Sequence, residues 1–276
     1  MSLAGQHRLQ IDSMATVAPQ ETDLPTVAEI EASPDVLSIP TNDIKVVRAR
    51  ERFAVKIGNR IPSQEAENMK FVAQNSNVPV PKVYDHFFDL ETQKRYIIMD
   101  YIPGADLEKA YHRSRQRRKR QSANGLEPYL MNYGISQIRG TLETWGASLI
   151  STNQEQMNQG ILATLSVRDS PQYVRLLRGM IARTLKDHKI VFTHGDLQPK
   201  NIMVERNGLQ EDGNSDFKIT LIDWNLSGWY PECWDFCNST VHCQLKPGWL
   251  ELIPDIMDEY TLEYLMMRVV YSSVFY

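Results

Sequence analysis

The sequence has no apolar segment long enough to cross a membrane or to serve as a secretory signal. Its 276 residues contain no uninterrupted apolar run of the ~18 residues that a membrane-spanning helix needs. Residues 1–23 are polar and lack the apolar core of a signal peptide. We therefore expect a protein that does not enter a membrane, and we expect residues 1–23 to form a flexible leader.

Cysteine is scarce, and its spacing is not that of a metal site. Cys233, Cys237 and Cys243 stand in the pattern C-x3-C-x5-C, which lacks the paired spacing of zinc sites. Burial on a helix face is the simpler interpretation. An odd number of cysteines without an export signal favours reduced thiols inside a cell, so we expect an intracellular protein in the cytoplasm.

No charge of one sign dominates the chain. The 30 basic and 34 acidic residues give a formal net charge of -4, so there is no overall attraction to nucleic acid or to anionic membranes. The exception is the run from Arg113 to Arg120, in which six of eight residues are basic. Such a run is either a nuclear-import signal or, more commonly, a solvated insertion, which leaves a nuclear location open.

Glycine is also missing from a region where it is often found in proteins that bind phosphate groups. No glycine occurs between Thr41 and Arg52. This excludes a G-x-G-x-x-G loop from that part of the chain, although a loop of bulkier residues can still present backbone amides to an anion.

The clearest positive signal is a polar loop from His194 to Asn201, with the sequence HGDLQPKN. Apolar stretches typical of short strands flank it, and a further apolar run, Ile219 to Ile222, ends on Asp223. Any one of these fragments could be a helix cap or an ordinary buried strand. Their combination and order favour a kinase-type site.

Phosphoryl transfer from ATP needs this set of residue types. The transferred group spreads negative charge over its equatorial oxygens, so the protein mainly positions the reactants and supplies magnesium. Asp196 is the candidate catalytic base, which accepts the proton of the attacking hydroxyl. Asn201 and Asp223 are the candidate Mg²⁺ ligands, because magnesium prefers oxygen donors and shares the phosphate oxygens. His194 is expected to brace the loop rather than to act as acid or base.

Upstream, the runs 44–47 and 52–57 are rich in β-branched and aromatic residues and are typical of adjacent strands. Lys56 lies in the second run and is either a solvated strand lysine or a phosphate ligand. A helix is expected to begin at Pro62. A glutamate in its first turns either pairs with Lys56 or only favours the helix N-terminus.

Several segments resemble the aminoglycoside phosphotransferase and choline kinase superfamily, in particular its small-molecule-kinase-like members. They occur in the same order along the chain as in that family. The segments are residues 24–30, 53–56, 78–84, 96–104, 194–201, 222–224 and 227–232.

The resemblance implies an α+β, protein-kinase-like fold of two lobes, with a small antiparallel-sheet N-terminal lobe and a mainly helical C-terminal lobe. It places the N-terminal lobe at residues 24–99, the hinge at 100–104 and the C-terminal lobe at 105–276. A divergent insertion at about residues 111–160 interrupts the last of these, because the resemblance fails there.

The resemblance also implies roles for single residues. Lys56 is expected to bind the nucleotide phosphates, with Glu65 as the glutamate that orients it and Glu67 in reserve. The backbone groups of Asp100 and Ile102 are expected to meet the adenine. Asp235 is either a buried brace of the catalytic loop or a surface carboxylate.

Four acidic residues of the expected last helix form either a pocket for cationic ligands or a solvated face. They are Asp255, Asp258, Glu259 and Glu263.

Two functions remain from these observations. The first is an ATP- and Mg²⁺-dependent phosphotransferase that transfers the γ-phosphate to a hydroxyl of a small molecule. The second is a non-catalytic kinase-like binding protein. A protein kinase is less favoured, because Trp224 and Asn225 follow Asp223 and no A-P-E segment appears before Cys233. The expected partner is a small molecule, not nucleic acid or membrane.

Overall fold

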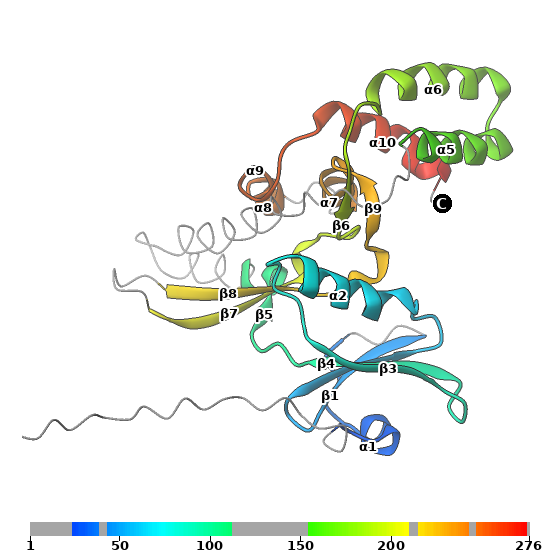
Figure 1. Cartoon of the computed structure of the whole chain (residues 1–276). Helices are drawn as coiled ribbons and strands as arrows, with labels where there is room; N and C mark the ends of the chain where they lie inside the picture. The colour runs from blue at the N-terminus through cyan, green and yellow to red at the C-terminus, as the bar shows by residue number, and fades with distance from the viewer. Residues whose placement is uncertain (1–23, 39–42, 112–153, 210–214, 243–246, 275–276) are drawn as a thin grey trace, which may run out of the picture.

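The structure of the protein is a computed structural model, shown in Figure 1. It describes residues 24–38, 43–111, 154–209, 215–242 and 247–274. The part up to Asp100 is built around one sheet, and the part from Ala105 onward is mainly helical with two small sheets. The expected leader at 1–23 and the basic run from Arg113 to Arg120 lie outside the described residues.

The N-terminal part is a four-stranded sheet in the order β1-β2-β4-β3, in which every neighbouring pair is antiparallel. Antiparallel neighbours need only short turns between them, and α2 is the one long connection. The elements are α1 (Val27–Glu31), β1 (Ile44–Ala49), β2 (Phe53–Gly58), α2 (Gln64–Asn75), β3 (Val83–Asp89) and β4 (Lys94–Asp100).

Different helices cover the two faces of this sheet. Because successive side chains of a strand point to opposite faces, Phe53, Val55 and Ile57 share one face, where they form a buried cluster with Ile30 of α1. Lys56 points to the other face, on which α2 lies. Figure 1 shows α2 between this sheet and the C-terminal part. The alternation along β2 therefore directs Lys56 toward the boundary between the two parts.

The C-terminal part combines helices with a three-stranded sheet, β5-β7-β8, and a two-stranded sheet, β6-β9. None of its described helices has both the length and the apolar character needed to span a bilayer, and neither do those of the N-terminal part. The elements are β5 (Ala105–Asp106), α5 (Gln154–Arg168), α6 (Pro171–Thr184), β6 (Ile190–Thr193), η3 (Pro199–Asn201), β7 (Ile202–Leu209), β8 (Ser215–Leu221), η4 (Trp224–Leu226), β9 (Gly228–Pro231), α7 (Trp234–His242), α8 (Pro247–Leu250), α9 (Ile253–Ile256) and α10 (Thr261–Val274).

Helix α6 follows from its sequence. Ser170 caps it by accepting a hydrogen bond from the Tyr173 amide, and Pro171 occupies the first position, where its missing N–H costs nothing. Leu177 and Ile181 are buried in the main core with residues of α5 and α10. Apolar residues that recur every three or four positions from Tyr173 onward are typical of such an amphipathic helix, and α6 ends at Thr184.

The end of the segment expected to diverge belongs to this helical core. Residues 154–160 are the first half of α5, and the side chain of Asn158 is buried and donates to the Leu185 carbonyl oxygen at 2.7 Å. Residues 112–153 lie outside the described residues. The polar composition near Asn153 therefore does not prevent the residues that follow it from forming a packed helix.

The chain passes from one part to the other between β4 and β5. Strand β4 ends at Asp100, and β5 pairs with β7 of the C-terminal part. Gly104, just before β5, has φ +102°, and a Cβ there would lie 2.2 Å from the Val204 carbonyl oxygen. Only glycine fits this close approach of two backbones.

Candidate active site

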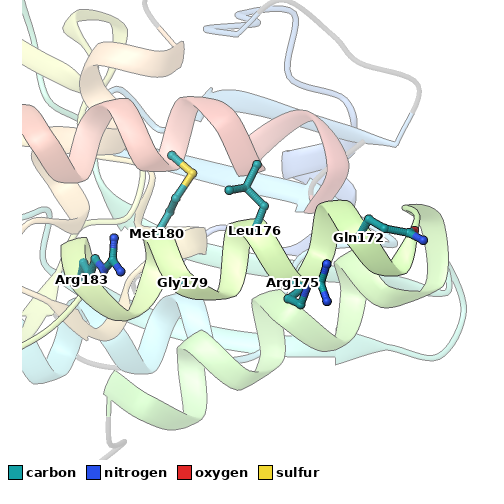
Figure 2. A pocket seen from close by; sticks show the side chains of 6 residues that line it. All are labelled: Gln172, Arg175, Leu176, Gly179, Met180 and Arg183. Carbon is teal, nitrogen blue, oxygen red and sulfur yellow. The ribbon is translucent and has the colours of Figure 1, made fainter.

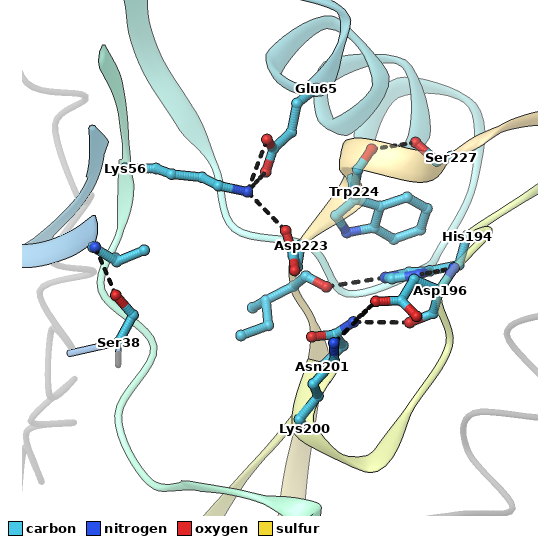
Figure 3. Close-up of polar contacts among 12 residues, drawn as sticks. Ser38, Lys56, Glu65, His194, Asp196, Lys200, Asn201, Asp223, Trp224 and Ser227 are labelled. Atoms are coloured by element: carbon cyan, nitrogen blue, oxygen red, sulfur yellow. Dashed lines mark hydrogen bonds and ion pairs between the residues drawn. The ribbon is translucent and has the colours of Figure 1, made fainter. Parts of the chain in front are cut away.

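The loop between β6 and β7 surrounds one carboxylate with hydrogen-bond donors. Asp196 is buried, and its Oδ1 accepts a hydrogen bond from the Gln198 side-chain amide. Its Oδ2 accepts from Asn201 Nδ2 at 3.1 Å and lies 3.2 Å from Lys200 Nζ. Asn201 Nδ2 also donates to the Asp196 carbonyl oxygen at 2.8 Å. Figure 3 shows the resulting convergence of Asp196 and Asn201.

His194 and Gly195 give the loop its conformation. The buried His194 ring approaches the Ile222 carbonyl oxygen through Nε2 at 3.0 Å, and its Nδ1 accepts from the Asp196 amide at 3.3 Å. Both ring nitrogens are thus engaged, which is a bracing role. Gly195 has φ +79°, and a Cβ there would lie 2.1 Å from the Leu226 carbonyl oxygen, so a larger residue cannot occupy this turn.

Helix α7 also holds this loop through hydrogen bonds. The two carboxylate oxygens of Asp235 accept from the amides of His194 at 2.9 Å and Gly195 at 2.8 Å. Burial raises the pKa of the Asp235 carboxyl, although these two amides and the nearby His194 favour its charged form. Of the two alternatives for Asp235, the structure shows the brace.

Two further residues of α7 also support the loop, by donating hydrogen bonds to its carbonyl oxygens. Asn238 donates to the Gly195 carbonyl oxygen at 3.1 Å, and Ser239 donates to that of Leu197 at 2.6 Å. Sequence reasoning missed both. They lie one helical turn after Asp235 on α7, and this three- and four-residue spacing was the available signal.

Lys56 lies between two carboxylates in the boundary between the two parts. Its Nζ is 2.8 Å from Glu65 Oε1, 2.9 Å from Glu65 Oε2 and 2.7 Å from Asp223 Oδ1 (Figure 3). The Lys56 and Glu65 side chains are only 8% and 1% exposed. Burial alone would lower the pKa of Lys56, but the two carboxylates outweigh it and raise this pKa, which keeps the ammonium charged.

Asp223 has an unusual backbone conformation, and its side chain contacts Lys56. It is in the left-handed region, with φ 66° and ψ 62°, directly before the short helix η4. A non-glycine residue held there often marks a functional site. Burial opposes its charge, but the Lys56 ammonium prevails and holds the pKa of Asp223 below its usual range.

Helix α2 is tied to the turn that follows Asp223. Asn68, one helical turn after Glu65 and on the same side of α2, donates through Nδ2 to the backbone oxygen of Ser227 at 3.0 Å and to its hydroxyl at 2.8 Å. Its own Oδ1 accepts from Gln64. Sequence reasoning missed Asn68, although its three-residue spacing from Glu65 places it on the same helix face.

Two oxygens in the cleft are suited to a cation. Among the described residues, none donates a hydrogen bond to Asn201 Oδ1 or to Asp223 Oδ2, whereas the other polar side-chain atoms of both residues are engaged. An amide and a carboxylate oxygen are the donors that Mg²⁺ prefers. Over the same part of the chain there is no group of three or more His, Cys, Asp or Glu residues that could hold a metal without further ligands.

Asp100 and Ile102, in the expected hinge, differ in whether the backbone amide is free to bind a ligand. The Asp100 amide donates to the Lys82 carbonyl oxygen at 3.0 Å, and its carboxylate accepts from the Tyr84 hydroxyl at 2.7 Å. The amide of Asp100 is therefore not available to a ligand. Within the described residues, the amide of Ile102 makes no backbone hydrogen bond.

The glycine-free region plays a different part from the one considered in the sequence. Residues 44–49 are strand β1, and the turn that follows lies at the hinge end, where the Tyr101 amide donates to the Arg52 carbonyl oxygen at 2.9 Å. The segment at the other end of the hairpin is 38–43, of which 39–42 lie outside the described residues. Most of the range without glycine is therefore a strand and not a loop that could cover phosphate groups.

The acidic residues near the end of the chain do not share one helix. Asp255 lies in α9, Asp258 and Glu259 lie between α9 and α10, and only Glu263 lies in α10. Glu263 Oε1 is 3.2 Å from His188 Nε2. The expectation of a single acidic face on the last helix is wrong, because a break after Ile256 separates these residues.

Another hollow lies on the outer face of α6, away from this cleft (Figure 2). Its volume is about 380 Å³. None of the residues of the β6–β7 loop, α2 or the Asp223 turn contributes to it. It is lined by Gln172, Arg175, Leu176, Gly179, Met180 and Arg183.

The sequence and the fold both match a known family. The family model described as the phosphotransferase enzyme family (APH) matches residues 45–261, a range that includes all of the site residues described above. The chain belongs to this phosphotransferase enzyme family. None of the curated proteins matches the sequence.

Solved structures with a similar fold are aminoglycoside phosphotransferases. The streptomycin-ATP-APH(2")-IIa ternary complex has a TM-score of 0.54 at 13% identity, covering 90% of this chain and 82% of that chain. A thermostable mutant of APH(4)-Ia with ADP and hygromycin B has 0.54 at 12%, covering 90% of both chains. The GDP complex of aminoglycoside 2'-phosphotransferase-IIIa has 0.57 at 10%, covering 87% and 81%. The predicted α+β, protein-kinase-like fold is confirmed.

Proposed function

We propose that the protein is an ATP- and Mg²⁺-dependent phosphotransferase that transfers the γ-phosphate to a hydroxyl of a small molecule. The observation that carries this proposal is that Asp196, Asn201 and Asp223 lie together beside the Lys56–Glu65 pair (Figure 3). These residues come from four separate segments: β2, α2, the loop between β6 and β7, and the segment before η4. A structural ion pair alone would not need the unengaged amide and carboxylate oxygens beside it.

Asp196 would act as the catalytic base. The acceptor hydroxyl gives its proton to the Asp196 carboxylate while its oxygen bonds to the γ-phosphorus. The bond from that phosphorus to the bridging oxygen breaks, and ADP leaves with the electron pair. The Asp196 carboxylate, braced through His194, Gln198 and Asn201, is held before the substrate arrives, which reduces the reorganisation needed in the transition state.

The residues present fit a magnesium ion. Asn201 and Asp223 would hold it through Oδ1 and Oδ2, and the phosphate oxygens would complete its coordination. When bound, Mg²⁺ neutralises charge that develops on the transferred group. Lys56 would then exchange part of its contact with Asp223 for the nucleotide phosphates, with Glu65 keeping its ammonium in place.

The hinge supports a purine at the edge of the same cleft. The unengaged amide of Ile102 is a donor for a ring nitrogen, and the carbonyl oxygen of Asp100 is the matching acceptor for an exocyclic amine. The similar structures named above contain ATP, ADP or GDP, which supports a nucleotide as the donor here. Their other ligands, streptomycin and hygromycin B, support a small molecule as the acceptor. We propose an intracellular, cytoplasmic protein that needs neither nucleic acid nor a membrane for this reaction.

The test separates nucleotide binding from transfer. We expect ATP with Mg²⁺ to raise the melting temperature, because a ligand that binds only the folded state stabilises it. Asp196→Asn keeps the size of the side chain but removes the base, so phosphate transfer to a panel of hydroxylated amines, sugars and acids should fall by roughly 10² or more while the thermal shift remains. The control is Asp255→Asn, an exposed carboxylate of α9, which should leave both readouts unchanged.

Two results would contradict the proposal in different ways. Transfer unchanged in Asp196→Asn would remove the mechanism. A thermal shift without transfer to any acceptor would favour the second candidate, a kinase-like protein that binds nucleotide without catalysis.

A further inference from the structure

Both carboxylate oxygens of Asp196, one of which an acceptor must reach, are contacted by side chains of its own loop. Gln198 donates to Oδ1, and the Lys200 ammonium is 3.2 Å from Oδ2. A catalytic base must offer one of these oxygens to the acceptor hydroxyl. The groups that cover Asp196 in this structure therefore adjoin the position at which the acceptor binds.

Lys200 and Asn201 are adjacent residues whose side chains differ strongly in exposure. Both lie on the short 3₁₀ helix η3, where successive side chains diverge by about a third of a turn. Asn201 is 3% exposed, whereas the Lys200 side chain is 51% exposed and still returns to Asp196 (Figure 3). Lys200 thus combines contact with the base and access from solvent.

The charge of Lys200 acts on two acids, Asp196 and Asp223, but the ion-pair partner of Asp223 is Lys56. The one ion-pair partner of Lys200 among the described residues is Asp196. Strand β5 packs against η3 and carries an acid, Asp106. Its Oδ2 forms an ion pair with Lys109 Nζ at 2.8 Å. Among the described residues, the Asp196 carboxylate is therefore contacted by an ammonium and two neutral amides and by no acidic group.

We propose that Lys200 selects acceptors that carry an anionic group, a carboxylate or a phosphate, next to the hydroxyl that is phosphorylated. This inference rests on the proposed function. When the acceptor hydroxyl takes Asp196 Oδ2, Lys200 loses its partner, and an anionic group of the acceptor replaces it. An ammonium at that position would instead face Lys200 across the cleft and be repelled.

The experiment uses three acceptors of similar size that share a glycerol chain: glycerate with a carboxylate, glycerol with a neutral group and 3-amino-1,2-propanediol with an ammonium. We expect wild-type kcat/KM to be about tenfold higher for glycerate than for the amine, a modest factor because Lys200 is half exposed. Lys200→Met should remove this preference, and Lys200→Glu should reverse it. The KM for Mg²⁺-ATP should change less than about twofold, because Lys200 acts on the acceptor.

A matched control and a folding check keep the result unambiguous. Lys186→Glu makes the same charge change at an exposed lysine after α6, and it should leave the order of acceptors unchanged. Melting temperatures of the Lys200 variants show whether they fold. An order of acceptors that Lys200→Glu leaves unchanged, a wild-type preference for the amine, or transfer to none of the three overturns the proposal. In each case transfer to the wider acceptor panel, compared between wild type and Asp196→Asn, shows separately whether the proposed function still stands.

Discussion

At the scale of single residues, the Lys56 ammonium is the centre of the cleft. It is shared by Glu65 and Asp223, and the three side chains come from β2, α2 and the segment before η4. A buried lysine is retained in its charged form only where such partners compensate for the loss of water. The same charge that links these elements is thus the one available to a nucleotide phosphate.

Replacing Lys56 with Met should affect stability and transfer together. Without the ammonium, the Glu65 and Asp223 carboxylates remain buried near each other, so we expect a loss of about 3 kcal/mol in the free energy of unfolding. Phosphate transfer should fall by about 10² or more, because the proposed phosphate ligand is lost. Urea unfolding and initial rates measure the two effects.

Lys70→Met on the same helix as Glu65 provides the comparison. Lys70 forms an exposed pair with Glu67 at 3.3 Å, which should contribute only about 0.5 kcal/mol or less. Similar losses in the Lys56 and Lys70 variants would show that burial of the Lys56 cluster has no special energetic weight.

At the scale of elements, α1 is too short to be stable by itself and depends on attachments to the sheet. Its N-terminus is closed by a capping box between Thr26 and Glu29. At its other end, Glu31 contacts Lys45 at 3.0 Å and Lys94 at 2.8 Å, and it accepts from the Tyr96 hydroxyl at 2.8 Å. These contacts join α1 to β1 and β4.

Glu31 should make stability depend on pH. Burial opposes its charge, but Lys94, Lys45 and Tyr96 lower its pKa to about 2 from 4.5. Since the folded-state pKa is depressed, the stabilisation is present above about pH 5 and is lost as the pH falls toward about 2. At neutral pH, Glu31→Gln should cost about 1–2 kcal/mol after allowance for solvent screening, and the difference from wild type should disappear near pH 2.

Chemical unfolding at several pH values measures this difference. Glu91→Gln, at an exposed turn between β3 and β4, should show no comparable loss at any pH. A Glu31→Gln effect of constant size from neutral to acidic pH would mean that the contribution is packing and not charge.

At the scale of the whole molecule, an aromatic cluster joins the two parts. Phe71 of α2 lies 5.0 Å from the Phe192 ring of β6 and 6.0 Å from the Trp229 ring of β9, measured between ring centroids. Phe192 and Trp229 are themselves 5.5 Å apart. Because α2 also carries Glu65 and Asn68, this cluster positions the helix that meets Lys56 and the turn after Asp223.

Phe71→Ala should weaken both stability and nucleotide binding. We expect a loss of about 2 kcal/mol in the free energy of unfolding, less than for a fully buried Phe because Phe71 is only partly buried. We also expect a higher KM for Mg²⁺-ATP, because α2 is less firmly placed. Phe88→Ala, a 43% exposed residue of β3, is the control and should change neither value appreciably. An unchanged KM in a destabilised Phe71→Ala protein would separate this cluster from the site.

Local patterns allowed much of the site to be predicted. The order of Asp196, Asn201 and Asp223 follows from short segments whose neighbours decide their conformation, and the periodicity of α6 and of the strands is likewise local. For the contact between Lys56 and a glutamate of α2, local patterns left two alternatives open, and the family resemblance implied Glu65. Glu65 is the residue that makes this contact.

Contacts between distant segments could not be predicted in the same way. Asp235 contacts His194 from 41 positions away in the sequence, and Asn68 contacts Ser227 from 159 positions away. A local sequence pattern therefore cannot predict either contact. The sequence by itself determined which side chains are candidates for the proposed phosphoryl transfer, because that depends on residue type and short spacing. Only the tertiary structure decided that Asp235 is a brace, that Asn68 ties α2 to the Asp223 turn and that Lys200 lies over Asp196. These outcomes depend on how separate elements pack and on which polar groups that packing must satisfy.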